Sequence, residues 1–372
     1  MKIAPFEIEQ YFDRYEFTTP YLLCASDCET MSVTELLQMA NVSLTDFARL
    51  RLGYTKAQGS LEMRTAVSRT YQTVQPDHVV ILTAPEEGIY LTMRTLLEPG
   101  DHVIVLTPAY NSLLNLAQHV SGNVSQWQIQ PTETGWQIDL DVFEQLVTPQ
   151  TKLIIVNFPH NPTGFLPTLE QFQAILDIAQ RYDAWLFCDE MYRGLELNGA
   201  PALPSAADRY QRAIVLAGLS KTHGLPGLRS GWLVIRDTAV RAQLQNWKHY
   251  TTICPPAPSE FLALAALQIQ DKLAARSRRL IEHNLQAADA FFDRWPQLFT
   301  WRRPQAGSVA LVGLNLPSAT DYCHALAQNA GILLLPSSYL DYGDQHVRMG
   351  FGRANFIDNL AEYEKYLLAA TR

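Results

Sequence analysis

The sequence lacks long apolar runs, clusters of basic residues and tracts of low complexity. A membrane-spanning helix needs about 20 mostly apolar residues, and no segment approaches that length. Residues 1–17 mix charged with aromatic side chains and contain no apolar core of a signal peptide. We therefore expect neither membrane insertion nor secretion. Because the net charge is −8 and no stretch is basic, we expect small molecules rather than nucleic acid or membranes as partners.

Cysteine is also scarce, with five residues scattered through 372. An odd number of widely spaced cysteines favours reduced thiols and a cytoplasmic protein over a disulfide framework. Cys24 and Cys28 have the spacing of a metal-binding pair, but no second pair of Cys or His accompanies them at ligand spacing. We therefore expect no metal site.

Between residues 77 and 235, short apolar runs alternate with helical periods. Runs that are apolar along their whole length are typical of strands buried on both faces, which indicates a mainly parallel sheet between helices and an α/β fold. Thr168 and Gln171 form a capping-box pattern that predicts a helix start. The predicted strands lie within residues 78–84, 102–110, 151–159, 184–192, 212–218 and 231–235.

The sequence changes character after residues 254–259, where a long helical stretch begins. The segments that follow it indicate a smaller α+β unit, to which the start of the chain returns. We expect a large domain of residues 45–260 and a small domain of residues 1–44 and 261–372.

Polar residues follow nearly every predicted strand, and ligands of open α/β sheets bind at the carboxyl ends of the strands. A lysine amine can form an imine with the aldehyde of pyridoxal phosphate, and a carboxylate can keep the pyridine nitrogen protonated. An arginine and the N–H groups of a helix start can bind the phosphate. This set of residues therefore predicts a pyridoxal phosphate site. Its members are Ala84 to Gly88, Tyr110, Asn161, Asp189, Tyr192, Ser220, Lys221 and Arg229.

Three segments in the same order carry a family resemblance: "NFPHNPTG" (157–164), "CDEMY" (188–192) and "SKTHGLPGLRSGW" (220–232). Together they resemble the class I/II aminotransferase family of fold-type I pyridoxal-phosphate enzymes, over about residues 50 to 355. The resemblance implies a large domain with a mainly parallel sheet between helices and a smaller α+β domain. It also implies pyridoxal 5′-phosphate as the cofactor.

The resemblance assigns a role to each matching residue. Lys221 matches the lysine that forms the Schiff base, and Asp189 matches the partner of the pyridinium nitrogen. Asn161 and Tyr192 match the groups that bind the ring hydroxyl oxygen, and Tyr110 matches the aromatic side chain that stacks on the ring.

Other matching residues concern the phosphate and the substrate. Arg229, helped by Ser220, matches the phosphate-binding arginine, whose planar fork suits an anion. Near the C-terminus, Arg348 matches the arginine that binds the substrate carboxylate, with Arg353 as the competing choice and Asn161 beside it. Tyr54 matches a tyrosine that reaches the phosphate of the neighbouring subunit, which implies a homodimer.

Two positions depart from the family pattern. The turn that cradles the phosphate is usually rich in Gly, Ser or Ala, whereas this chain reads "TAPEEG" there. Pro85, which precedes Glu86 in that turn, has no N–H to donate. Gly218 stands where many members have Ser or Thr. We therefore expect the phosphate to depend more on other contacts and the cofactor to bind less tightly.

The leading hypothesis is an aminotransferase that moves an amino group between an L-amino acid and a 2-oxo acid, with Lys221 as the base. A carbon–sulfur lyase acting by β-elimination and an amino-acid-cyclising enzyme remain alternatives, because the cofactor stabilises the same carbanion in these reactions. The same residues also support β-replacement and, in some relatives, decarboxylation. No second arginine is apparent for a side-chain carboxylate, so a dicarboxylic substrate is not indicated. A non-catalytic sensor module is disfavoured, since residues 1–50 leave no room for a DNA-binding domain. A nicotinamide-dependent dehydrogenase would need a G-x-G-x-x-G segment after a strand, which is missing.

Overall fold

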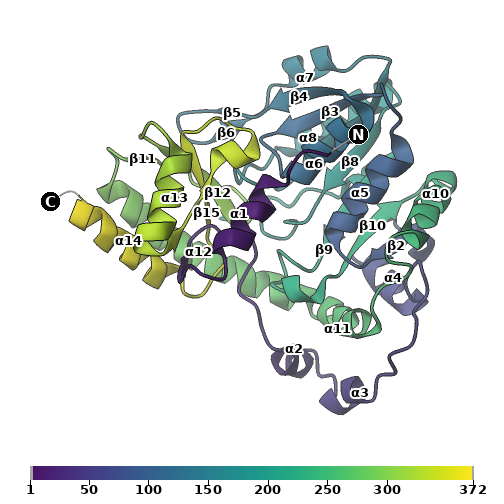
Figure 1. Ribbon diagram of the computed structural model, residues 1–372. Coiled ribbons are helices and arrows are strands. Elements are labelled where there is room, and N and C mark those ends of the chain that lie inside the picture. Colours follow the sequence, from purple (N-terminus) through teal and green to yellow (C-terminus); the bar gives the residue numbers. More distant parts are fainter. Residues whose placement is uncertain (1–2, 371–372) are drawn as a thin grey trace.

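The computed structural model describes residues 3–370, and its centre is a seven-stranded sheet with helices on both faces (Figure 1). The strands of this sheet are β2 (Val79–Leu82), β3 (His102–Thr107), β4 (Asn123–Gln128), β7 (Thr151–Asn157), β8 (Trp185–Asp189), β9 (Ala213–Gly218) and β10 (Gly231–Ile235). Their order is β2-β10-β9-β8-β7-β3-β4. All neighbours from β9 to β4 are parallel, whereas β10 is antiparallel to β2 and β9. The predicted α/β class with a mainly parallel sheet is confirmed.

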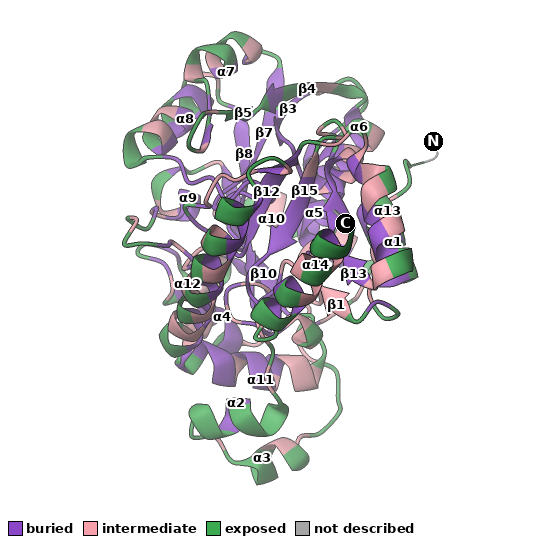
Figure 2. Cartoon of the chain, turned by 90° about the vertical axis from the view of Figure 1, so that its left-hand side faces the viewer, coloured by how far each residue is buried: buried purple, intermediate pink, exposed green. Residues whose placement is uncertain are grey.

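Side chains of the strands alternate between two buried clusters, one on each face of the sheet. Along β3, Val103 and Val105 join one cluster, and Ile104 and Leu106 join the other. Because both faces are covered, the central strands are buried throughout, as Figure 2 shows in purple. One face carries α5 (Pro85–Leu96), α6 (Asn111–Ser121) and α10 (Thr238–His249), and the other carries α4 (Leu61–Ser68), α7 (Leu140–Leu146), α8 (Leu169–Arg181) and α11 (Ala257–Gln268).

Local signals account for two of these helix starts. The Thr168 hydroxyl accepts from the Gln171 amide, and the Gln171 side chain accepts from the Thr168 amide, so the predicted capping box is present. Helix α5 begins with Pro85 directly after β2, and no side chain caps its first turn. Its first N–H groups are therefore left to face the carboxyl edge of the sheet.

A second sheet lies in the C-terminal part and is antiparallel, with the order β11-β12-β15-β14. Its strands are β11 (Phe299–Thr300), β12 (Val309–Leu314), β14 (Leu335–Pro336) and β15 (His346–Gly350). Helices α12 (Gln270–Arg294), α13 (Ala319–Ala330) and α14 (Phe356–Ala370) pack with it in a separate buried cluster. The long helical stretch expected after residue 259 is two helices, α11 and α12, which meet at Ile269. A smaller α+β unit is thus present, while the exact domain bounds stay a prediction.

The start of the chain packs against this second unit. Strand β1 (Tyr21–Leu22) pairs in parallel with β13 (Ile332–Leu333). The Gly350 amide donates to the Leu23 carbonyl at 2.8 Å. A Cβ atom at Gly350 would lie 1.8 Å from the Ala25 carbonyl oxygen, so only glycine permits this approach. The tight contact fixes residues 23–29 against the end of β15.

Helix α1 (Glu7–Tyr15) lies between the two units, beside α13 (Figure 1). The Tyr11 ring packs against the rings of His324 and Tyr339, with centroids 5.4 and 5.3 Å away. At its other end, the Ile8 amide donates to the Asn111 side chain at the start of α6. Helix α1 is therefore held from both sides.

Candidate active site

A cavity of about 380 Å³ lies at the carboxyl ends of β8 and β9, between the large sheet and α1. Its volume falls within the range typical of small-molecule sites. Most residues predicted to bind cofactor or substrate line it, but Tyr54, the competing Arg353, and Ala84, Glu87 and Gly88 of the α5 turn do not. The predicted residues that line it are Pro85, Glu86, Tyr110, Asn161, Asp189, Tyr192, Ser220, Lys221, Arg229 and Arg348.

Lys221 follows β9, and its Nζ donates to the Ser26 hydroxyl at 2.8 Å. Burial lowers the pKa of Lys221, Asp27 opposes that shift, and Arg348 adds to it. A lower pKa leaves more of the amine neutral, and only the neutral amine can attack a carbonyl carbon. The environment of Lys221 therefore suits the predicted nucleophile.

Asp189 ends β8, and its carboxylate accepts from the Met191 amide at 3.0 Å. Burial raises the pKa of Asp189 to about 7, although the Met191 hydrogen bond and Lys221 both lower it. A cation placed against this carboxylate would favour its ionised form. A protonated pyridine nitrogen is such a cation, so the site fits the role predicted for Asp189.

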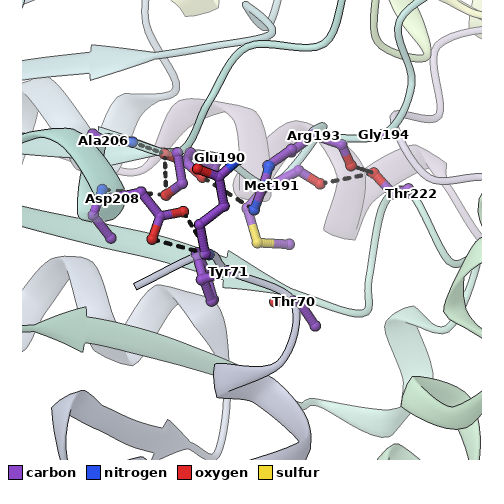
Figure 3. A network of polar contacts seen from close by, with 12 residues as sticks. Thr70, Tyr71, Glu190, Met191, Arg193, Gly194, Ala206, Asp208 and Thr222 are labelled. Atoms are coloured by element: carbon purple, nitrogen blue, oxygen red, sulfur yellow. Dashed lines mark hydrogen bonds and ion pairs between the residues drawn. The ribbon is translucent and has the colours of Figure 1, made fainter. Parts of the chain in front are cut away.

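The neighbouring Glu190 does not line the cavity, and Figure 3 shows its contacts with the segment around Ala206. Its carboxylate accepts from the Ser205 hydroxyl at 2.9 Å and from the Ala206 amide at 2.8 Å, and Arg193 lies 3.9 Å away. Consecutive residues at a strand end face opposite sides. Alternation thus explains why only Asp189 of the Asp-Glu pair reaches the cavity.

Thr222 ties the lysine loop to the segment after β8. Its hydroxyl donates to the Arg193 carbonyl at 2.9 Å (Figure 3). Because Thr222 follows Lys221 directly, this bond helps to position the lysine relative to Asp189.

Asn157 braces two site residues and was not identified from the sequence. Its side-chain amide donates to the Asp189 carbonyl at 2.9 Å, and its oxygen accepts from the Asn161 amide at 2.8 Å. Asn157 is the last residue of β7, and a polar residue at the end of an apolar run was the available signal in the sequence.

Arg348 extends from β15 into the cavity and is 1% exposed. Its Nη1 donates to the Asn161 side-chain oxygen at 3.3 Å, and its Nη2 donates to the Cys24 carbonyl at 3.0 Å. The competing Arg353 pairs instead with Asp27 at 2.9 Å and does not line the cavity. The structure thus places the preferred arginine, Arg348, where a substrate carboxylate could bind.

The phosphate end of the predicted site consists of Arg229, Ser220 and the start of α5. Arg229 follows η2 (Pro226–Leu228) and has a left-handed backbone, with φ of 48°. Its Nη1 donates to the Pro226 carbonyl at 3.1 Å, and the side chain reaches the cavity. Glu86 lies in the first turn of α5, where burial raises its pKa to about 7 and the hydrogen bond from Ser112 lowers it.

The two departures from the family pattern are in contact with each other. A Cβ atom added to Gly218 would lie 3.1 Å from the Pro85 ring and 3.0 Å from the Ser230 carbonyl. A Cβ atom added to Gly231 on the neighbouring strand would lie 2.9 Å from the same ring. Pro85 therefore fills space that a serine or threonine at position 218 would need, so one change in packing accounts for both departures.

Tyr54 lies outside the cavity and is 91% exposed. Its predicted contact is with the cofactor phosphate of a neighbouring subunit. Its role stays a prediction.

Residues of the N-terminal segment form a wall of the cavity that sequence reasoning missed. They are Ile8, Glu9, Phe12, Glu16, Ala25, Ser26 and Asp27. The spacing of Glu9, Phe12 and Glu16 places them on one face of a helix, which was the available signal. Their arrival at the site depends on the packing of α1 and could not be read from that spacing.

Tyr110 contacts this wall. Its hydroxyl donates to Glu9 at 2.7 Å, and its ring meets the Phe6 ring edge to face at 5.1 Å. Tyr192 also lines the cavity and is buried, and burial raises its pKa while Arg348 lowers it.

The polar groups of the cavity fit pyridoxal phosphate. Within residues 3–370, the buried Ser220 hydroxyl and the Arg348 Nε have no hydrogen-bond partner, and buried polar atoms are rarely left so. An amine, a buried carboxylate, an arginine and a helix start together provide donors and acceptors for an aldehyde, a pyridine nitrogen and a phosphate. The fold and this cavity thus define a fold-type I pyridoxal-phosphate protein.

Comparison with known proteins identifies the family. The family model described as aminotransferase class I and II matches residues 19–363, so the chain belongs to this family. Its cofactor is pyridoxal 5′-phosphate, and the predicted resemblance is confirmed.

The similar proteins include both aminotransferases and cyclases. Capreomycidine synthase of Streptomyces vinaceus is 30% identical over 79% of this chain and 75% of that protein. A pyridoxal-phosphate-dependent aminotransferase from Streptococcus suis has a TM-score of 0.92 at 29% identity, with 99% of each chain covered. The pyridoxal-phosphate-dependent cyclase OrfR has a TM-score of 0.89 at 25% identity, covering 98% of this chain and 97% of OrfR.

Two further observations bear on the expected partners. Among the helices within residues 3–370, none has the length and apolar character needed to cross a membrane. In the same part of the chain, no three His, Cys, Asp or Glu side chains form a group suited to a metal ion. The five cysteines are free, and burial raises the pKa of both Cys24 and Cys28 to about 12.

The raised pKa of Asp189 makes a prediction about stability without cofactor. The pKa is about 7 in the folded chain against an ordinary 3.8, so between these pH values the folded chain holds a proton that the unfolded chain has released. The contribution of Asp189 to the free energy of unfolding therefore falls as pH rises through this window. Replacing Asp189→Asn should stabilise the cofactor-free protein by about 1–2 kcal/mol more at pH 8 than at pH 5.5. Urea unfolding at both pH values measures this, and an equal effect at both would contradict it.

The contact between Pro85 and position 218 predicts a coupled effect on cofactor affinity. Gly218→Ser alone should weaken pyridoxal phosphate binding by roughly tenfold, because its Cβ presses on Pro85 and the Ser230 carbonyl. Adding Pro85→Ala should relieve the contact and restore an N–H, so the double variant should bind more tightly than Gly218→Ser. Titration of the cofactor by absorbance measures all three affinities. Equal affinity of the single and double variants would show that the two positions are not coupled.

Proposed function

We propose that the protein is an aminotransferase that moves an amino group between an L-amino acid and a 2-oxo acid. The observation that carries the proposal is that Lys221, Asp189 and Arg348 line one cavity. The first two residues suit cofactor chemistry, and the third suits an amino-acid carboxylate. The similarity to the Streptococcus suis aminotransferase supports the same reaction.

Four residues of the cavity have a part in this proposal. Arg348, oriented by Asn161, binds the substrate carboxylate. Lys221 would move a proton from the substrate Cα to the C4′ atom of the cofactor. Its lowered pKa favours the neutral amine that can accept this proton. Asp189 keeps the pyridine nitrogen protonated. When bound, pyridoxal phosphate accepts the electron pair that a departing group leaves on Cα.

Cyclisation of an amino acid is a second candidate function. It is supported by the similarity to capreomycidine synthase and to the cyclase OrfR. The residues around Lys221 serve either reaction, because both begin with a group lost from Cα. Carbon–sulfur elimination remains a third outcome of the same chemistry.

A homodimer in the cytoplasm is part of the proposal. Large apolar side chains are exposed near Tyr54, among them Leu52, Tyr250 and Ile253. The Thr55 hydroxyl donates to the Pro255 carbonyl, which brings the two segments together. Such a patch is typical of a protein interface, and a second chain placed there could receive Tyr54.

Spectroscopy with single amino acids tests the function. The protein loaded with pyridoxal phosphate should change its visible spectrum on addition of a suitable L-amino acid and release a 2-oxo acid, and a second 2-oxo acid should restore the spectrum. Lys221→Ala should slow this by about 10²–10⁴-fold, while Lys152→Ala, an exposed lysine outside the cavity, should not.

Other outcomes separate the alternatives. Release of ammonia with the original spectrum restored indicates elimination, and a ring product without a released 2-oxo acid indicates cyclisation. Failure of the unaltered protein to bind the cofactor would contradict every version. Sedimentation of the same preparation should give the mass of two chains.

A further inference from the structure

The N-terminal wall of the cavity is acidic. Glu9 and Glu16 reach it from α1 and the residue after that helix, and Asp27 reaches it from the following loop. Glu9 and Glu16 are seven residues apart, so they share one helix face with Phe12 between them. The wall therefore presents three carboxylates to one small cavity.

The three carboxylates differ in their partners. Asp27 pairs with Arg353, and Glu9 accepts the neutral hydroxyl of Tyr110. Within residues 3–370, the Glu16 carboxylate has neither a hydrogen bond nor an ion pair. Burial and the neighbouring Asp27 raise the pKa of Glu16, and Arg353 and Lys221 lower it. Two carboxylates of this wall thus have no cation of their own.

The cations of the cavity are needed elsewhere under the proposed function. Lys221 holds the cofactor, Arg229 its phosphate and Arg348 the substrate carboxylate. None of the three is left to neutralise Glu9 or Glu16. Both carboxylates line the cavity, although Glu16 is half-buried and Glu9 is exposed. A positive charge on the ligand would give both of them a counter-ion.

The acidic wall borders the predicted substrate end of the cavity. The Arg348 guanidinium lies over the Phe12 ring at 5.9 Å from its centroid, so the substrate-carboxylate residue touches the same helix face. The buried Arg348 Nε, which lies at this end, has no hydrogen-bond partner within residues 3–370, so the space before it is suited to a ligand. Two further acidic residues line the cavity. Glu86 lies at the phosphate end, where Ser112 donates to it, and Asp189 is the predicted partner of the pyridine nitrogen.

We propose that the substrate is an L-amino acid whose side chain ends in a cation, an ammonium or a guanidinium, bound by Glu9 and Glu16. This inference rests on the proposed function. A dicarboxylic amino acid would meet like charges at this wall, and an apolar one would cover the half-buried Glu16 without giving it a partner. An amino acid with a cationic side chain fits both parts of the cavity. Its α-carboxylate would bind Arg348, and its side chain would bind Glu9 and Glu16.

Binding of stable cofactor–substrate adducts tests this without any turnover. We would titrate the full-length protein, freed of cofactor, with the phosphopyridoxyl adducts of L-arginine, L-lysine, L-norleucine and L-glutamate by calorimetry. All four share the pyridoxyl part, so the ratio of their dissociation constants isolates the side chain. The arginine or lysine adduct should bind at least about tenfold more tightly than the norleucine adduct, and the glutamate adduct should bind most weakly.

Variants of the acidic wall assign the effect. Glu16→Gln and Glu9→Gln should each reduce the preference for the cationic adduct severalfold while leaving norleucine binding nearly unchanged. Asp13→Asn is the matched control, since Asp13 lies on α1, is exposed and does not line the cavity. A preference that survives in both Gln variants would overturn the assignment to Glu9 and Glu16.

The unaltered protein separates the two levels of the proposal. Equal binding of the cationic and norleucine adducts, or tighter binding of the glutamate adduct, would overturn the cationic substrate and leave the aminotransferase standing. Failure of all four adducts to bind would overturn both.

Discussion

The removal of Lys221 and Asp189 from water is the constraint on which the site depends. Lys221 follows β9 and Asp189 ends β8. Burial lowers the pKa of Lys221 and raises the pKa of Asp189, so burial favours the neutral form of both. Buried ionisable groups need partners in order to remain charged. A cofactor that offers an aldehyde to the amine and a pyridine nitrogen to the carboxylate relieves both at once. The neighbouring contacts, from Asn157 to Thr222, hold the two groups at the same edge.

A second buried lysine shows that burial alone does not make a reactive amine. Lys248 is fully buried, but its Nζ lies 3.3 Å from Glu87 and 2.6 Å from the Thr252 hydroxyl. These partners hold Lys248 as a structural cation on α10. Lys221 instead donates to one neutral hydroxyl, Ser26, and lines the cavity. The different partners explain why Lys221 is a candidate nucleophile and Lys248 a structural cation.

The sequence predicted the parts of the fold that local patterns determine. The apolar runs marked six strands of the large sheet, and Thr168 marked the start of α8. The exposed edge strand β4 was missed, because its mixed side chains have no apolar pattern. Residues that follow strands could likewise be assigned to the cavity, because parallel strands bring their carboxyl ends to one edge.

The rest of the site depends on packing between distant segments. Ser26 reaches the cavity because residues 23–29 lie tightly against the end of β15. Glu9 and Glu16 reach it because α1 packs between α6 and α13. The link between Pro85 and Gly218 joins two positions 133 residues apart, and no local pattern encodes it. The sequence already favoured Arg348 over Arg353, but the ion pair between Arg353 and Asp27 depends on tertiary packing.

The most direct measurement is to locate the covalent attachment of the cofactor. Borohydride reduction of the loaded protein, followed by proteolysis and mass spectrometry, identifies the modified lysine. The account predicts a phosphopyridoxyl group on Lys221 alone. Attachment to Lys248 or to a surface lysine would contradict it, because the cavity, Asp189 and Arg348 would then not form the active site.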